Sequence, residues 1–192
     1  VGGLAAKFSG AKFIRTRHLS NRIRSSKLNF INELADYIFT TGQSVRQDMV
    51  DFNRIKPQKI ISIPTGIDDE IFNPSLYDRD IERKNLDLKE NEIAVGIIAV
   101  IRTFKRHDLF IEMASELLKK HDNLKFFIAG DGPIKNDIEE LIKKKGLIDN
   151  IFLLGHVDAP ANLLCALDIF TLTSDSKEGV PQSVMQALLM KL

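Results

Sequence analysis

The feature that most restricts how this chain can fold is an uninterrupted apolar run at residues 93–101. A strand with one face in water alternates apolar and polar residues, whereas a strand buried on both faces is apolar at consecutive positions. Strands of the second kind lie in parallel sheets that helices cover on both sides. This run therefore predicts an α/β fold built around a parallel sheet.

The rest of the chain alternates β-favouring runs with segments long enough to form helices. Residues 42–52 predict one helix, with Ser44 as a candidate cap, and apolar residues recur at helical spacing between 134 and 142. This alternation predicts parallel sheets covered by helices, in one large domain or in parts of two. The runs that predict strands are residues 11–16, 37–41, 59–63, 93–101, 124–129, 150–157 and 169–172.

The charge of the chain is balanced in total but uneven in distribution. There are 27 basic and 26 acidic residues, so a net charge of +1 argues neither for nor against nucleic acid. No aromatic residues interleave with the basic ones in a pattern for base stacking, so no nucleic-acid partner is expected. The segment before Glu33, the first acidic residue, can face an anionic acceptor, lipid headgroups or simply water. Its basic residues are Lys7, Lys12, Arg15, Arg17, Arg22, Arg24 and Lys27.

The cysteine content and the hydropathy of the chain point to the cytoplasm. Cys165 is the only cysteine and lies in the apolar run 163–167, which predicts a small core residue and no disulfide. No apolar run approaches the roughly 20 residues of a membrane span, and no signal peptide is visible. We therefore expect a cytoplasmic protein. Its basic segment would allow peripheral contact with the inner face of the membrane.

The loop that follows the apolar run carries a pair of cations. Arg102 and Lys105 are three residues apart at the carboxyl end of the predicted strand, where open α/β sheets bind their ligands. Two cations in this position can hold a diphosphate from both sides and offset the charge of a departing nucleotide. Ordinary surface ion pairing is the alternative.

A second candidate site lies between the strand at 169–172 and a helix that begins near Pro181. Proline suits the first turn of a helix, because its missing N–H would have no partner there. The N–H groups at such a helix start attract phosphate or sugar oxygens, and Glu178 adds an acceptor for hydroxyl groups. The pattern predicts a site for a phosphorylated sugar, unless Glu178 is only a surface charge.

The residues Glu178, Gly179 and Pro181, followed by Gln186, resemble the Glu-x7-Glu signature of the family 4 retaining glycosyltransferases, which have the two-domain GT-B fold. In that family the first glutamate lies near the donor sugar and the second accepts from the ribose hydroxyls of the nucleotide. Here Gln186 replaces the second carboxylate. An amide can still accept through its carbonyl oxygen, but as a neutral and weaker partner.

The resemblance implies further site residues along the chain. His18 matches a histidine close to the reacting sugar on the acceptor side, and Arg102 with Lys105 resembles a compact version of the family's donor-diphosphate pair. The Gly-x-Gly-Pro turn after the strand at 124–129 matches the family's nucleotide loop, and a later backbone position matches the one that contacts the base. These nucleotide-side positions are Gly130, Gly132 and Val157.

The resemblance also implies the domain organisation. Residues 1–66 would be the carboxyl-terminal part of the acceptor-side Rossmann-like domain, and 92–192 the first half of the donor nucleotide-sugar domain. The segment around Gly66 resembles the family's interdomain crossover, which assigns 67–91 as a linker. On this interpretation the chain is an internal fragment with both domains incomplete, and the isolated fragment would be inactive.

The resemblance implies a glycosyltransferase that moves a sugar from a nucleotide-diphosphate sugar to a hydroxyl acceptor with retention, in cell-envelope or polysaccharide biosynthesis. The acceptor would be a glycan, a lipid or a small molecule, with lipid-linked and anionic acceptors included. No metal or other cofactor is expected, because no cluster of His and Asp ligands is evident. Two alternatives stay open: a nucleotide-sugar 2-epimerase, and a binding or scaffold domain that has lost catalysis, for which Gln186 is an argument.

Overall fold

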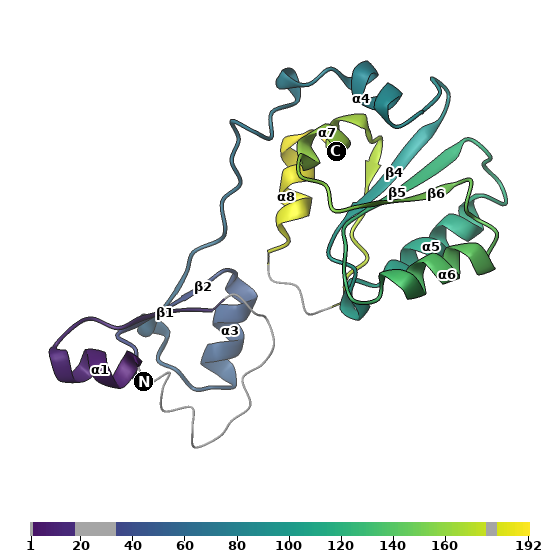
Figure 1. The fold of residues 1–192 in the computed structure, drawn as a ribbon. Coiled ribbons are helices and arrows are strands. Elements are labelled where there is room, and N and C mark those ends of the chain that lie inside the picture. Colours follow the sequence, from purple (N-terminus) through teal and green to yellow (C-terminus); the bar gives the residue numbers. More distant parts are fainter. Residues whose placement is uncertain (1, 18–33, 176–179) are drawn as a thin grey trace. The chain divides into compact units, whose positions relative to one another are not determined.

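The computed structural model describes residues 2–17, 34–175 and 180–192 of the chain (Figure 1). The chain divides into two compact units. The first, called here the N-terminal unit, comprises the described residues up to Gly66 together with Val180, and the C-terminal unit comprises the other described residues from Ile67 on. The α/β architecture that we expected is confirmed by the parallel sheet in each unit.

The N-terminal unit contains a three-stranded parallel sheet in the order β1-β2-β3. Ile14 of β1 pairs with Tyr37 of β2, and Ile38 pairs with Ile60 of β3. Its small core gathers Ala35, Ile38, Met49, Ile55 and Ile60. The elements are α1 (Gly2–Ser9), β1 (Ile14–Arg17), β2 (Tyr37–Thr40), α3 (Gln43–Asp51), η2 (Pro57–Lys59) and β3 (Ile60–Ser62).

One local expectation in this unit is wrong. Helix α3 begins one residue before Ser44, and its N-cap is Gly42, which has no side chain to accept a hydrogen bond. Gly42 has the extended backbone that an N-cap position needs, with φ −163° and ψ 153°. Ser44 therefore lies inside the first turn and does not cap the helix.

The C-terminal unit is built on a four-stranded parallel sheet in the order β6-β5-β4-β7. Strand β5 covers the residues predicted for it, whereas β7 is two residues long where four were expected. The elements are η3 (Pro74–Leu76), α4 (Arg79–Asn85), β4 (Ile93–Ile98), η4 (Thr103–Lys105), α5 (His107–Leu117), β5 (Leu124–Ala129), α6 (Lys135–Lys144), β6 (Ile151–Gly155), α7 (Pro160–Ala166), β7 (Ile169–Phe170) and α8 (Gln182–Leu189).

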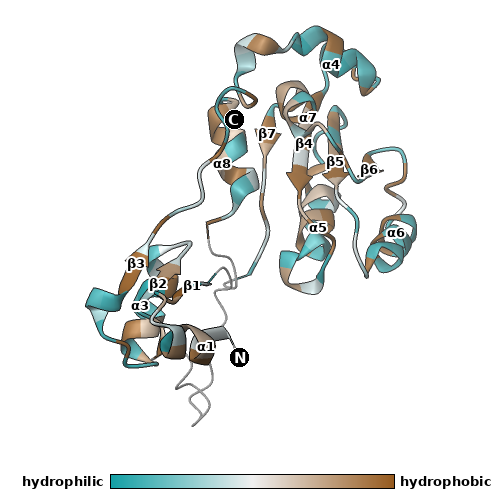
Figure 2. Cartoon of the chain, turned by 60° about the vertical axis from the view of Figure 1, so that its left-hand side comes forward, coloured by the Kyte–Doolittle hydropathy of each residue, from teal (hydrophilic) through white to brown (hydrophobic). Residues whose placement is uncertain are grey.

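The central sheet of this unit has a core on each face, as the apolar run predicted. Neighbouring residues of a strand point to opposite faces, so Phe126 packs in the core with α5 and α6 while Phe127 packs in the core with α7 and α8. Figure 2 shows polar, teal residues along much of α6, whose buried positions are Ile138 and Ile142. Cys165 lies in the second core and is buried, as expected, and desolvation raises the pKa of its thiol.

The charged segment that precedes β4 is fixed to the C-terminal unit by a carboxylate. Asp168 accepts from Arg79 at 2.6 Å, from Arg83 at 2.9 Å and from the backbone N–H of Ala94 at 2.8 Å. Arg79 also donates to the carbonyl oxygens at the end of α7. These contacts connect helix α4 to the start of β4 and to the residue that precedes β7. No helix in the described parts of the chain is long and apolar enough to cross a membrane.

Candidate active site

The polar loops of the C-terminal unit meet at the carboxyl edge of its sheet, because parallel strands all end on the same side. Backbone hydrogen bonds connect each of these loops to the loop that follows the neighbouring strand of the sheet. The N–H of Gly130, after β5, donates to the carbonyl oxygen of Gly155 at the end of β6 (2.6 Å). The N–H of Ile101, after β4, donates to the carbonyl oxygen of Asp131 (2.9 Å). The ends of β4, β5 and β6 are thereby tied into one surface.

The loop with Arg102 and Lys105 is also fastened to the segment after β7. The N–H of Asp175 donates to the carbonyl oxygen of Phe104 (2.9 Å). The hydroxyl of Thr173 lies 3.0 Å from the carbonyl oxygen of Lys105 and 2.9 Å from that of Arg106. The structure thus holds both predicted cations in one loop, and it ties that loop to the residues directly before the 176–179 segment.

Three cations occur in this loop, and they differ in their surroundings. Arg106 donates through Nε and Nη2 to Asp108 at 2.7–3.1 Å, and this guanidinium lowers the pKa of the Asp108 carboxyl. Arg102 is exposed, and the Lys105 ammonium lies 5.6 Å from the ring centre of Phe104. The positive charge of Arg106 is therefore offset within the loop, while Arg102 and Lys105 bring positive charge to the edge of the sheet.

His107, the first residue of α5, is a buried residue of this region that the sequence did not single out. Its side chain is 1% exposed, and neither ring nitrogen has a hydrogen-bond partner among the described residues. Burial lowers the pKa of His107 from 6.5 to about 4, and the nearby charge of Lys105 acts in the same direction. The imidazole is therefore neutral at pH 7. The Ser174 hydroxyl is similarly buried and has no partner among the described residues.

The two glycines of the predicted nucleotide turn are required by the packing of the loops. A Cβ atom on Gly130 would lie 2.0 Å from the carbonyl oxygen of Ala99, and φ at Gly130 is 149°. A Cβ atom on Gly132 would lie 2.2 Å from the carbonyl oxygen of Ile101. Only glycine lets the turn after β5 approach the end of β4 this closely. Any ligand on this turn would meet backbone rather than side chains at these two positions.

Of the remaining predicted residues, some lie in the carboxyl-terminal half of the chain and the others in segments that the structure does not describe. Val157 follows β6, is half-buried and packs against the core beneath it. Gln186 lies half-buried on α8, whose N-cap is Pro181. His18, Glu178 and Gly179 lie outside the described residues. Within the described ranges, no group of three or more His, Cys, Asp or Glu side chains could hold a metal ion.

The two parallel sheets, with polar loops at the carboxyl edge of the second, are those of a Rossmann-like α/β protein, and solved glycosyltransferases that share this architecture confirm the expected GT-B type. The sequence pattern of the family described as glycosyl transferases group 1 matches residues 78–192, and the chain belongs to this family.

Curated relatives agree with the family assignment. The chain is 23% identical over 196 residues to the putative glycosyltransferase EpsF of Bacillus subtilis, covering 96% of this chain and 50% of EpsF. It is 31% identical over 137 residues to the UDP-Gal:alpha-D-GlcNAc-diphosphoundecaprenol alpha-1,3-galactosyltransferase of Escherichia coli, covering 69% of this chain and 35% of that enzyme. The chain therefore spans half or less of the length of these relatives.

Solved structures show the same fold. A glycosyltransferase from Rickettsia africae has a TM-score of 0.87 at 24% identity, over 99% of this chain and 52% of that protein. HepE of Anabaena, in complex with UDP and glucose, has a TM-score of 0.82 at 16% identity, over 98% of this chain and 53% of HepE. At these identities the likeness establishes the fold alone.

Proposed function

We propose that the protein transfers a sugar from a nucleotide-diphosphate sugar to a hydroxyl acceptor with retention, as a family 4-type glycosyltransferase. The observation that carries this proposal is the loop of Arg102 and Lys105, held at the carboxyl end of a central strand by Thr173 and by the N–H of Asp175. Parallel α/β sheets bind ligands at this edge, and paired cations suit a diphosphate.

The chemistry of the proposed reaction explains the need for these cations. Transfer breaks the bond between the anomeric carbon of the sugar and the diphosphate oxygen, so negative charge develops on the departing nucleotide. Arg102 and Lys105 would stabilise that charge more strongly as it develops, which is the requirement for catalysis. The neutral His107 beneath the loop adds no positive charge of its own at pH 7. We propose that Arg102 and Lys105, rather than a metal ion, offset the charge of the diphosphate.

The other roles follow the family pattern. Glu178 would orient the donor sugar, Gly179 would let the backbone approach it, and Gln186 would accept from the ribose. His18 would act on the acceptor side. The turn of Gly130 and Gly132 would face the nucleotide, and the backbone at Val157 would contact the base. The direct hydrogen bond between the Gly130 N–H and the Gly155 carbonyl supports this nucleotide side, because it brings the two loops together (2.6 Å).

The relatives suggest the substrate classes. Solved neighbours include HepE in complex with UDP-glucose and the pneumococcal GtfA in complex with UDP and GlcNAc. Curated relatives are named for a diphosphoundecaprenol-linked acceptor and for poly(ribitol-phosphate). We therefore propose a UDP-sugar donor and an anionic or lipid-linked acceptor of the cell envelope. The basic amino-terminal segment, in which Lys7 and Lys12 are exposed, would contact that acceptor or lipid headgroups at the inner face of the membrane.

The test is a transfer assay with the full-length protein, a set of radiolabelled UDP-sugars and lipid-linked or polyol-phosphate acceptors. The proposal expects labelled acceptor with the α-configuration from an α-linked donor, and release of UDP. Conversion of the donor sugar to its 2-epimer without transfer would indicate the epimerase instead. Binding of UDP-sugar without any turnover would indicate a binding or scaffold protein.

A further inference from the structure

A further cation, Lys135, lies near the end of β6, on the far side of β5 from the loop of Arg102 and Lys105. Lys135 is the first residue of α6, directly after the Gly-x-Gly-Pro turn. Its ammonium nitrogen reaches the end of β6, since a Cβ atom on Gly155 would lie 4.0 Å from Lys135 Nζ. The turn after β5, the start of α6 and the end of β6 therefore meet at one corner.

The backbone at this corner is irregular. The pairing of β5 with β6 shifts between Ile128 and Ala129, so that Ala129 pairs with Gly155 rather than with Leu154. Gly155 has φ 69°, in the left-handed region that favours glycine. Such bulges re-aim the chain at the end of a strand. With no side chain on Gly155, the Lys135 ammonium lies directly over the backbone that leads to Val157.

The ammonium of Lys135 is available to a ligand. Its described ion-pair partner is Asp131, with 3.8 Å between Nζ and Oδ2, and the two side chains are 32% and 59% exposed. Exposed pairs of this length contribute little and exchange readily with other partners. An ammonium has three N–H donors and no acceptor, so it suits a ligand that presents an oxygen.

The spacing of the strands separates this corner from the diphosphate loop. Strand β5 lies between β4 and β6, and neighbouring strands are about 4.8 Å apart, so the ends of β4 and β6 are about 10 Å apart. In the proposed function the backbone at Val157, after β6, contacts the base, so a nucleotide whose phosphates lie at Arg102 and Lys105 would extend its base toward the end of β6. Lys135 would then meet the base, not the phosphates.

We propose that Lys135 selects the nucleobase of the donor, favouring a base with a ring carbonyl oxygen, such as uracil, over one with an amino group in the same place, such as cytosine. The inference rests on the proposed function. A carbonyl oxygen accepts from the ammonium, whereas an amino group would set two donors against each other and leave both unpaired. Sites that hydrogen-bond one substrate group discriminate strongly against analogues that lack it.

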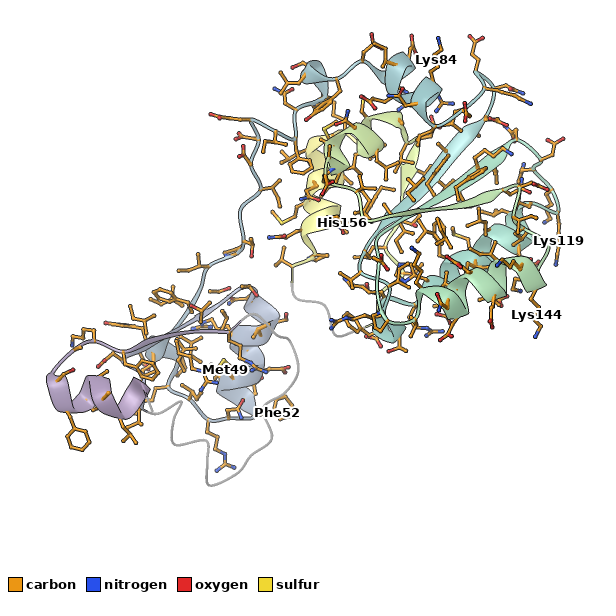
Figure 3. All side chains as sticks on the ribbon, in the orientation of Figure 1. Met49, Phe52, Lys84, Lys119, Lys144 and His156 are labelled. Carbon is orange, nitrogen blue, oxygen red and sulfur yellow. The ribbon has the colours of Figure 1, made fainter. Side chains whose placement is uncertain are left out.

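The test compares UDP with CDP, which share ribose and diphosphate and differ in the base at position 4, a carbonyl oxygen or an amino group, and at N3, which carries a proton only in UDP. Dissociation constants are measured by isothermal titration calorimetry on the full-length protein. Lys135→Met keeps the aliphatic stem but removes the ammonium. Lys144→Met is the matched control, since Lys144 is exposed at the far end of the same helix (Figure 3). Lys135→Arg retains a cationic donor and should keep part of the preference.

We expect the unaltered protein to prefer UDP, and Lys135→Met to weaken UDP binding about tenfold or more while CDP changes little. The preference for UDP over CDP should then nearly disappear, whereas Lys144→Met should leave it unchanged. Equal weakening of UDP and CDP would assign Lys135 to ribose or phosphate and overturn the proposal, as would an unchanged preference. If the unaltered protein binds neither nucleotide, the proposed function itself fails.

Discussion

The hydroxyl oxygen of Thr173 lies 3.0 Å from the carbonyl oxygen of Lys105, which places a side chain after β7 against the backbone of the cationic loop after β4. A second contact, from the N–H of Asp175 to the carbonyl oxygen of Phe104 at 2.9 Å, lies two residues further on. The loop proposed to bind diphosphate and the segment that leads to Glu178 are therefore joined. Displacing one should disturb the other.

Thr173→Val tests this connection, because valine keeps the branched shape and removes the hydroxyl. We expect a loss of about 0.5–1.5 kcal/mol in the free energy of unfolding, the usual cost of one hydrogen bond. Binding of UDP should weaken as well, because the loop of Lys105 loses its anchor. Urea unfolding and calorimetric titration measure the two effects. Thr103→Val, in the exposed first position of η4, is the control; equal UDP binding in both variants would contradict the connection.

Arg102→Ala and Lys105→Ala should each lower kcat/KM for sugar transfer by about 2–4 kcal/mol of transition-state stabilisation, the range for removing one charge-stabilising donor. Their melting temperatures should change little, because both side chains lie at the surface or half-buried. Lys119→Ala is a suitable control, since Lys119 is exposed just after α5 and pairs only locally with Glu116 among the described residues (Figure 3). Unchanged turnover in both loop variants would remove the diphosphate role.

The main elements of the C-terminal unit could be predicted from the sequence because their signals are local. Burial on both faces makes residues 94–97 of β4 apolar at consecutive positions, and amphipathic spacing identifies α6 from its own residues alone. The cationic pair and the glycine turn could be recognised for the same reason. Each is defined by a few adjacent residues that directly follow a strand.

Features that depend on distant partners could not be predicted. The charged residues before β4 resemble a solvated linker, yet Arg79 and Arg83 bind Asp168, 89 and 85 residues further along the chain. In helix α5, Phe110 and Ala114 are buried at a spacing of four residues, whereas Leu109 in the adjacent apolar row is 43% exposed. A periodic pattern does not say which of two adjacent apolar rows faces the sheet.

Gly130→Ala should destabilise the protein by about 3 kcal/mol or more, because a methyl group cannot avoid the Ala99 carbonyl oxygen and the φ of 149° is strained for alanine. Gly146→Ala is the matched control. Gly146 also has positive φ, at 69°, but a Cβ atom there would meet nothing within 4 Å. The Gly146→Ala substitution should therefore lower the free energy of unfolding by only about 1 kcal/mol, from backbone strain. Thermal and urea unfolding of the two variants provide the comparison, and equal destabilisation would show that the close approach of the loops does not matter.

The pH dependence of stability should carry a contribution from His107. Its pKa is about 4 in the folded protein, below the ordinary value of 6.5, because burial disfavours the charged imidazolium. The unfolded chain therefore takes up this proton first as the pH falls, and folding loses stability between about pH 6.5 and pH 4. The full loss from this residue is about 3 kcal/mol, since each pKa unit corresponds to 1.36 kcal/mol. His107→Leu should remove this contribution, so that its free energy of unfolding falls less between pH 7 and pH 4.5 than that of the unaltered protein. Urea unfolding at both pH values measures the difference, and parallel pH profiles would show that His107 becomes charged in the folded state at no cost.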